Sequence, residues 1–122
     1  MSALTSDLVG IGLTSQQAKM LGDTQNNTVT ANGNTQGTAT ALTGSINNVT
    51  VVTATNNGVI LPLAASTPYS WIMVRNSDAA DTLNVWPAVG DAMNALVNTP
   101  VGVAVGTGKV FCKINSVGWV TT

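Results

Sequence analysis

Charged side chains are scarce in this sequence, and two residue types that often carry out chemistry are missing. Only 7% of its 122 residues are charged, against about 25% in ordinary soluble domains, and it contains neither glutamate nor histidine. Without histidine, Ser-His-Asp and Cys-His catalytic arrangements and histidine-based zinc sites are excluded, and the usual proton-transfer residue is missing. The sequence therefore predicts a protein that is not an enzyme and that binds no metal or other cofactor.

The pattern of charge and hydropathy also argues against nucleic acid and membranes as partners. The formal net charge is −1, so there is no excess of positive charge to neutralise phosphates. No charged residue occurs from Thr24 to Val74, but this stretch is rich in Thr and Asn and has no run of about 20 apolar residues that could cross a membrane. Amide and hydroxyl groups must therefore provide the solubility that charges provide elsewhere.

Cysteine occurs once, and aromatic residues make up only 4% of the sequence. The single Cys112 excludes an internal disulfide and cysteine-rich metal sites. Because it alternates with Val110 and Ile114, it is expected to be an inert residue of the core. The N-terminus lacks the basic region and apolar stretch of a signal peptide, and together these features predict synthesis in a reducing cytoplasm.

The first region, residues 1–22, is predicted to be an anchoring arm with one short helix. Thr14 and Gln17 have the spacing of a capping box, and Gly22 is typical of a helix end, which places the helix at residues 15–21. A helix of this length is only marginally stable alone in water, so it needs a packing partner.

The arm carries seven apolar residues that we expect to form a contact surface. Four of them precede the helix in an extended or turning segment that is interrupted by glycines, and three lie on the helix. This surface could fold back on its own domain or dock on a partner protein or a sister subunit, and we take docking as the working hypothesis. The predicted capsid or subunit contact residues are Leu8, Val9, Ile11, Leu13, Ala18, Met20 and Leu21.

The second region, residues 23–48, is dominated by Thr, Asn, Gln and Gly, and it has too few apolar residues to form a core. It is consistent with a polar extended linker between the arm and the body. It is equally consistent with polar edge β-structure that becomes ordered beside symmetry-related copies, and the sequence does not separate the two.

The third region, residues 49–122, is predicted to be a β-domain. Short β-branched and apolar segments alternate with turn residues, which is typical of an antiparallel β-sandwich or barrel, jelly-roll-like in outline. The segment 69–74 is nearly continuously apolar, so we expect a central strand with Trp71 in the core. The expected strands are 49–53, 58–62, 69–74, 82–86, 101–105, 109–114 and 119–121, whereas 91–96 could be strand or helical turn.

Two groups of side chains in the body deserve a chemical interpretation. Asp78, Asp81 and Asp91 could bind calcium or act as paired carboxylates in sugar hydrolysis, although support of turns and solubility is the simpler role. Trp86 and Trp119 could form an exposed platform on which sugars stack, or they could fill a barrel end or a subunit interface. Neither group amounts to catalytic machinery.

Four segments of the body, together with the start of the arm, carry a family resemblance. They are 58–62, 71–77, 83–87 with Gly90-Asp91, and 109–112 leading to 118–120, and the arm adds its glycine-interrupted apolar start and short Gln/Ala helix. In these features the chain resembles small bacteriophage virion proteins of the capsid-decoration (cement) or head-fibre type. The resemblance implies no catalytic residues. It implies a homotrimer of β-barrel or jelly-roll bodies on the outside of a capsid, with the arm contacting the major capsid protein or a neighbouring trimer.

The sequence thus predicts a structural virion protein that decorates and stabilises a bacteriophage capsid as a symmetric oligomer. Its expected partners are the major capsid protein and its own copies, with neither nucleic acid nor membrane among them. Its expected location is the outer capsid surface of the virion, after synthesis in the host cytoplasm. An alternative is a phage fibre or tail component that binds host-surface glycans through Trp86 and Trp119, and a third is an assembly module of non-viral origin.

Overall fold

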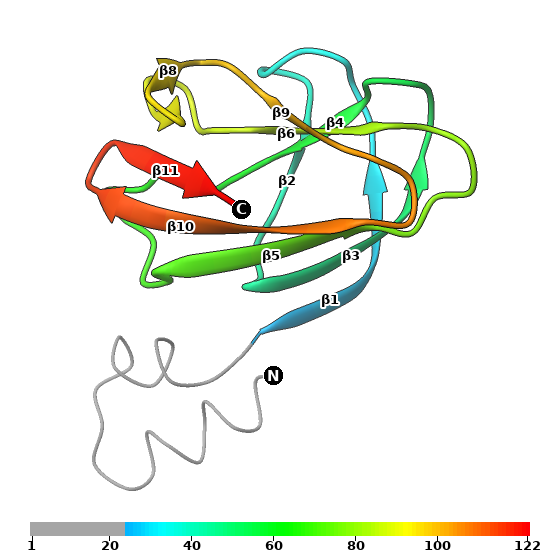
Figure 1. The fold of residues 1–122 in the computed structure, drawn as a ribbon, viewed down its shortest axis with the longest axis horizontal. Helices are drawn as coiled ribbons and strands as arrows, with labels where there is room; N and C mark the ends of the chain where they lie inside the picture. Colours follow the sequence, from blue (N-terminus) through cyan, green and yellow to red (C-terminus); the bar gives the residue numbers. More distant parts are fainter. Residues whose placement is uncertain (1–23) are drawn as a thin grey trace, which may run out of the picture.

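The computed structural model describes residues 24–122, so the predicted arm and its helix lie outside the described residues. From residue 24 onward the chain is mainly β, as the sequence predicted, and this part contains no helix that could cross a membrane. Eleven strands form two sheets, which lie one above the other and enclose one hydrophobic core (Figure 1).

Successive strands alternate between the two sheets from the first strand to the seventh. The seven-stranded sheet contains, in spatial order, β1 (Gln25–Ala31), β3 (Ile46–Val52), β5 (Trp71–Asn76), β10 (Gly108–Asn115), β11 (Gly118–Thr121), β7 (Ala92–Met93) and β8 (Leu96–Val97). The four-stranded sheet contains, in order, β2 (Thr40–Ala41), β4 (Gly58–Ile60), β6 (Leu83–Trp86) and β9 (Val101–Val103). The chain therefore crosses the core at every step from β1 to β6.

The first six strands wind as a parallel coil. β1, β3 and β5 are parallel neighbours in the larger sheet, and β2, β4 and β6 are parallel neighbours in the smaller sheet. Because each strand is followed by one in the opposite sheet, the chain re-enters the first sheet in its original direction and forms no hairpin there. The sheets are therefore mixed, and the expectation of an antiparallel sandwich is wrong for these six strands.

The C-terminal strands cover the last turn of the coil and pair antiparallel, as the sequence predicted, except that β7 and β11 are parallel. β10 pairs with β5 and with β11, and β9 pairs with β6. The segment 91–96, which the sequence left open, contains the turn of a β7–β8 hairpin. Its turn residues Asn94 and Ala95 have φ angles of 51° and 70°, which suits the mirror-image turns that match the twist of hairpin strands.

One core lies between the sheets and consists mostly of small aliphatic side chains. Its two large aromatic members are Phe111 and Trp119, both fully buried. Leu83 and Val85 point inward from β6, as the alternation of that strand predicted. The prediction that Trp71 lies in the core is wrong. Every second residue of β5 faces away from the core, and Trp71, at one of these positions, is 41% exposed.

Strand β10 has the opposite orientation to the one expected from its sequence. Phe111 faces the core, and Lys113 lies on the same side of the strand, where its Nζ donates to the carbonyls of Ala64 and Thr67 at 3.2 and 2.9 Å. Lysine can occupy this side because its stem packs against apolar neighbours while its charged end reaches loop carbonyls. Cys112 therefore faces outward and is half-buried, so the prediction of an inert core cysteine is wrong.

The polar region before residue 49 forms an edge of each sheet. β1 is the edge strand of the larger sheet and β2 is an edge strand of the smaller one. Polar side chains tie this region to the body, since Gln36 Nε2 donates to the Pro87 carbonyl and the Tyr69 hydroxyl donates to Thr24 Oγ1, both at 2.8 Å. The expected domain boundary at residue 49 falls inside β3, so residues 24–48 are part of the β-body.

Candidate assembly surface

The β7–β8 and β10–β11 hairpins turn at the same end of the molecule (Figure 1, left). Five large aliphatic residues of these hairpins and of the loop before β7 are each more than half exposed. We call them the apolar end, and they are Val89, Leu96, Val97, Ile114 and Val117. No charged residue occurs in residues 92–108 or 114–122, so the sequence around this end is uncharged as well as apolar.

Backbone hydrogen bonds hold the parts of the apolar end in fixed positions. Ala92 N donates to Val117 O at 2.8 Å, which joins the two hairpins. Gly90 N donates to Asn98 Oδ1 at 2.8 Å, and Asn98 N donates to Asp91 O at 3.0 Å, which ties the preceding loop to the strand β8. Because these segments are already ordered, a partner that docks on them loses little conformational entropy on binding.

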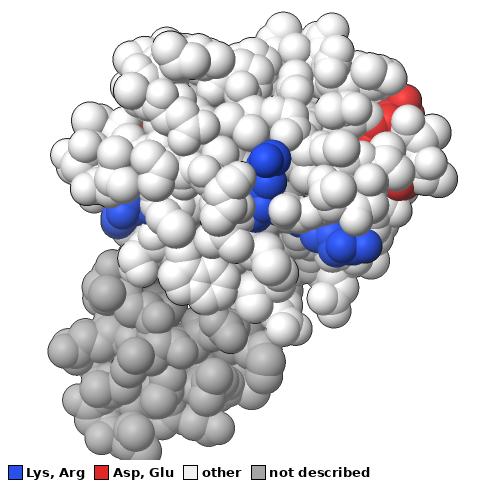
Figure 2. Space-filling view, in the orientation of Figure 1, with Lys and Arg blue, Asp and Glu red and all other residues white. Residues whose placement is uncertain are grey.

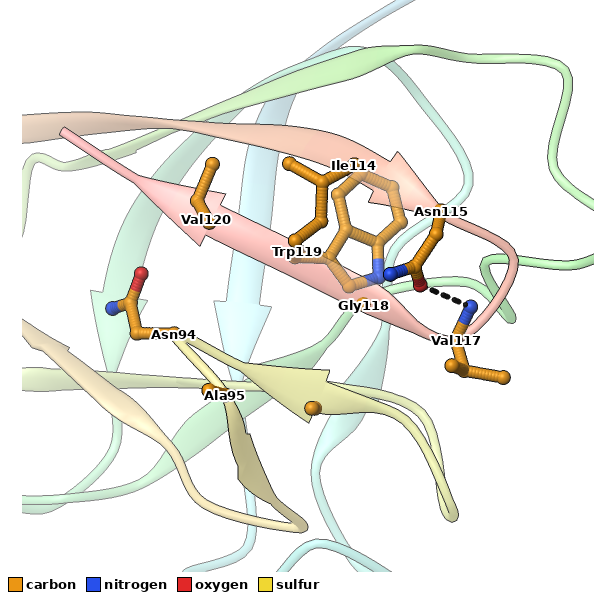
Figure 3. Close-up of a pocket in the computed structure, with 9 residues that line it drawn as sticks. Asn94, Ala95, Ile114, Asn115, Val117, Gly118, Trp119 and Val120 are labelled. Atoms are coloured by element: carbon orange, nitrogen blue, oxygen red, sulfur yellow. Dashed lines mark hydrogen bonds between the residues drawn. The ribbon is translucent and has the colours of Figure 1, made fainter.

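A pocket of about 420 Å³ opens between the two hairpins (Figure 3). It is lined by Ala92, Asn94 and Ala95 on one side and by Ile114, Asn115 and residues 117–120 on the other. The absent side chain of Gly118 leaves part of this space open. A Cβ at Gly118 would lie 3.2 Å from Asn115 Oδ1 and 3.6 Å from Ile114 Cγ1. The pocket is large enough to accept an apolar side chain of a partner.

Two amide side chains give the apolar pocket a polar component. Asn94 Oδ1 accepts a hydrogen bond from Thr121 N at 3.1 Å, and Asn115 Oδ1 accepts one from Val117 N at 2.9 Å (dashed in Figure 3). These bonds fix the amide oxygens and leave the Nδ2 groups as donors without an acceptor in residues 24–122. The pocket therefore suits an aliphatic side chain that is flanked by backbone carbonyls.

The three aspartates of the body support loops and do not converge on one site. Asp78 accepts three backbone N–H groups, and the hydrogen bond from Val52 N, followed by those from Ala80 and Asp81, holds the pKa of its carboxyl below the usual value. Asp81 accepts a threonine hydroxyl at 2.8 Å, and the buried Asp91 accepts a backbone N–H at 2.9 Å. Across residues 24–122 no three His, Cys, Asp or Glu side chains come together as metal ligands.

Surface charge is confined to a few separated groups. Figure 2 shows isolated Lys and Arg side chains surrounded by uncharged surface, with acidic groups at the right-hand edge of the view. Such a surface forms contacts through apolar, amide and hydroxyl groups, and these contacts require little desolvation of ions.

Trp86 and Trp119 do not form an open sugar-stacking surface. Trp119 is fully buried, so the idea that it is an exposed platform is wrong. Trp86 is half-buried and packs over Gly58, where a Cβ would lie only 3.0 Å from Trp86 Cδ1. The inward position of Trp119 follows from its pairing with Lys113, which also lies on the core side of its strand.

The apolar end could not be recognised from the sequence. Its valines and leucine are dispersed over residues 89–117, and the parallel pairing of β7 with β11 brings them together. Isolated exposed aliphatic residues are common on proteins, so no single one of them is a signal. The residues predicted to make the capsid or subunit contact, from Leu8 to Leu21, lie outside the described residues, and their role stays a prediction.

Comparison with protein-family models, with curated proteins and with solved structures finds no match to this chain. The resemblance of its motifs to phage virion proteins therefore remains a prediction from sequence. The function has to be argued from the geometry of the surface itself.

Proposed function

We propose that this chain is a non-enzymatic structural protein that decorates and stabilises a bacteriophage capsid as a symmetric oligomer. The observation that carries the proposal is the apolar end, a preorganised group of five exposed aliphatic side chains, of which Ile114 and Val117 line the pocket. Contiguous exposed apolar surface on a soluble protein is typical of a protein–protein contact. The phage context comes from the resemblance of the sequence motifs.

The proposed partner at the apolar end is the major capsid protein. An aliphatic residue of that partner would enter the pocket between the hairpins and act as the anchor of the contact. The amide groups of Asn94 and Asn115 would donate hydrogen bonds to the backbone on either side of this residue. The surrounding apolar side chains would exclude water from the anchor.

Symmetry is the second element of the proposal. In a homotrimer on the outer surface of a capsid, three modest contacts combine through their effective concentration, so no single contact has to be strong. Binding to the assembled shell then stabilises it by mass action. The arm with its short helix belongs to the same proposal as a further contact.

The alternative role as a glycan-binding fibre or tail component finds less support. Sugar stacking needs an accessible aromatic face. Of the two tryptophans predicted to form the platform, Trp119 is buried and Trp86 is half-buried. The exposed Trp71 lies in the other sheet from Trp86, so the tryptophans do not form one platform.

The proposal can be tested by mixing the purified protein with empty phage shells and measuring co-sedimentation, with light scattering to determine the mass of the free protein. We expect the parent to be a symmetric oligomer that sediments with shells, and Leu96→Asp to remain folded but stay in the supernatant. Val105→Asp is the matched control, because Val105 is also exposed but lies in the turn at the opposite end of β10. Binding of Leu96→Asp at the parent level would exclude the apolar end as the contact, and a parent that ignores shells would refute the capsid role.

A further inference from the structure

The larger sheet also carries apolar side chains on the face that points away from the core, and these adjoin the pocket of the apolar end at Val120. Strand register places three of its residues side by side on β5, β10 and β11, and three more in the next row on β3, β5 and β10. We call these six residues the outer patch, and they are Trp71, Cys112 and Val120, then Ile46, Met73 and Val110. Trp71 and Val120 are 41% and 36% exposed, and the other four are half-buried.

Within residues 24–122, one charged side chain on a strand borders the outer patch. Arg75 is the next outward-facing residue of β5 after Met73, and it is exposed. The other charged residues on the described strands, Lys109 and Lys113, alternate with the outward-facing residues of β10 and lie on its core side. The outward-facing order along β5 is therefore Trp71, Met73 and Arg75, two apolar residues and a cation at a two-residue spacing.

Residues 7–13 carry the complementary pattern in reverse order. In an extended chain every second side chain points to the same side. One side of this segment then consists of Asp7, Val9, Ile11 and Leu13, and the other consists of Leu8, Gly10 and Gly12. The side that begins with Asp7 presents an anion and then aliphatic residues, at the same two-residue spacing as the outward-facing residues of β5. The side that contains the two glycines presents mostly backbone.

We propose that residues 7–13 lie on the outer patch of their own chain, antiparallel to β5. Placed in this way, Asp7 faces Arg75 and Ile11 lies over Trp71. The apolar residues remove the patch from water, and the ion pair selects this register, because a shift by one residue would turn glycines toward the patch. This proposal does not rest on the proposed function. It assigns residues 7–13 to their own domain, next to the pocket of the apolar end at Val120, and leaves only the predicted helix of the arm for a contact with a partner.

The connection to β1 permits this arrangement. Gln25, the first residue of β1, is in register with Ile46, which is in register with Met73, so the chain enters the sheet beside the outer patch. β1 and β5 are two strand spacings apart, about 10 Å, whereas residues 14–24 can span about 36 Å when extended and about 24 Å if 15–21 are helical. A tether of this length gives an effective concentration in the millimolar range, which favours docking within one chain over exchange between copies.

Cys112 provides a direct readout, because it lies in the outer patch and is the only cysteine of the chain. We would measure the rate at which a thiol reagent labels it in the full-length protein. Ile11→Asp should raise this rate by roughly an order of magnitude, because a charge on the covering side opens access to the thiol. Leu8→Asp is the matched control on the opposite side of the same segment, and it should label at the parent rate.

Equal rates for the parent and Ile11→Asp would overturn the proposal, and so would equal acceleration in Ile11→Asp and Leu8→Asp. Circular dichroism and the urea midpoint of each variant separate local uncovering from loss of the fold. The ion pair gives a second test. Asp7→Arg and Arg75→Asp should each accelerate labelling and the double variant should restore protection, whereas additive acceleration would refute the register. Protection that appears only at high protein concentration would overturn docking within one chain.

Discussion

Replacing Asn76 by alanine should destabilise the protein by about 3 kcal/mol. Asn76 is fully buried on β5, where its Nδ2 donates to the carbonyls of Asp81 and Val103 at 2.9 and 3.0 Å and its Oδ1 accepts from Asp78 N at 3.0 Å. Val103 belongs to β9 in the opposite sheet, so this amide is a polar link across the core. The Asn76 side chain also orders the loop that contains Asp78 and Asp81.

The magnitude follows from the number of hydrogen bonds lost. Each contributes about 1 kcal/mol net, so the loss of the three bonds amounts to about 3 kcal/mol. Asn84→Ala is the matched control. Asn84 is half-buried on β6 and its side chain makes no hydrogen bond within residues 24–122, so its replacement should cost less than about 1 kcal/mol.

The assay is equilibrium unfolding in urea, followed by tryptophan fluorescence, at fixed protein concentration. With a slope of about 1–3 kcal/mol per M, a loss of about 3 kcal/mol lowers the midpoint by at least about 1 M. The slope itself should stay unchanged, which separates a change in stability from a change in the compactness of the unfolded chain. If Asn76→Ala and Asn84→Ala shift the midpoint equally, the link across the core does not contribute as argued.

Two further substitutions test local features of the fold. Gly33→Ala should lower the free energy of unfolding by about 1–3 kcal/mol or more. Gly33 has φ +80°, and a Cβ there would lie 2.3 Å from the Thr38 carbonyl oxygen. Gly37→Ala is the control: nothing lies within 4 Å of its added Cβ, so the urea midpoint should stay unchanged. Asp78→Asn should flatten the acid dependence of stability. The pKa of Asp78 is lowered in the folded state, chiefly by the Val52 N–H, so its contribution is present above the unfolded value near 3.8 and is lost as pH falls through the folded value. The urea midpoint of the parent should therefore fall more steeply on acidification than that of Asp78→Asn, and parallel curves would contradict this assignment.

Local patterns predicted the strands of the body well because those strands alternate or are β-branched. Leu83 and Val85 were expected to face inward and do so. The polar strands β1 and β2 have no such apolar pattern, because as edge strands they owe their order to neighbours that are distant in sequence. The parallel pairing of the coil could not be predicted either, because turn residues show where a strand ends but not which sheet the next strand joins.

The orientation of a strand relative to the core was the second quantity that local patterns could not determine. Trp71 and Cys112 were both expected inside, and both face outward. An error of one residue in register turns every side chain of a strand to the other face, so each such prediction fails as a whole. Along β10 the lysines suggested a solvated face, but Lys113 reaches loop carbonyls from the core side. The apolar end was missed because it depends on the pairing of β7 with β11.

The position of the aromatic core residues has a consequence for the order of folding. The buried apolar side chains on the six strands of the coil are all aliphatic, and the two buried aromatic side chains, Phe111 and Trp119, come from β10 and β11. A growing chain that has emerged as far as β6 therefore lacks the two side chains that fill the centre of the core. Its six strands then have little to pack against. Folding should accordingly wait until β11 has left the ribosome and then occur in one cooperative step. The apolar end, which β7 and β11 form together, would then become available for assembly only on chains whose core is already closed.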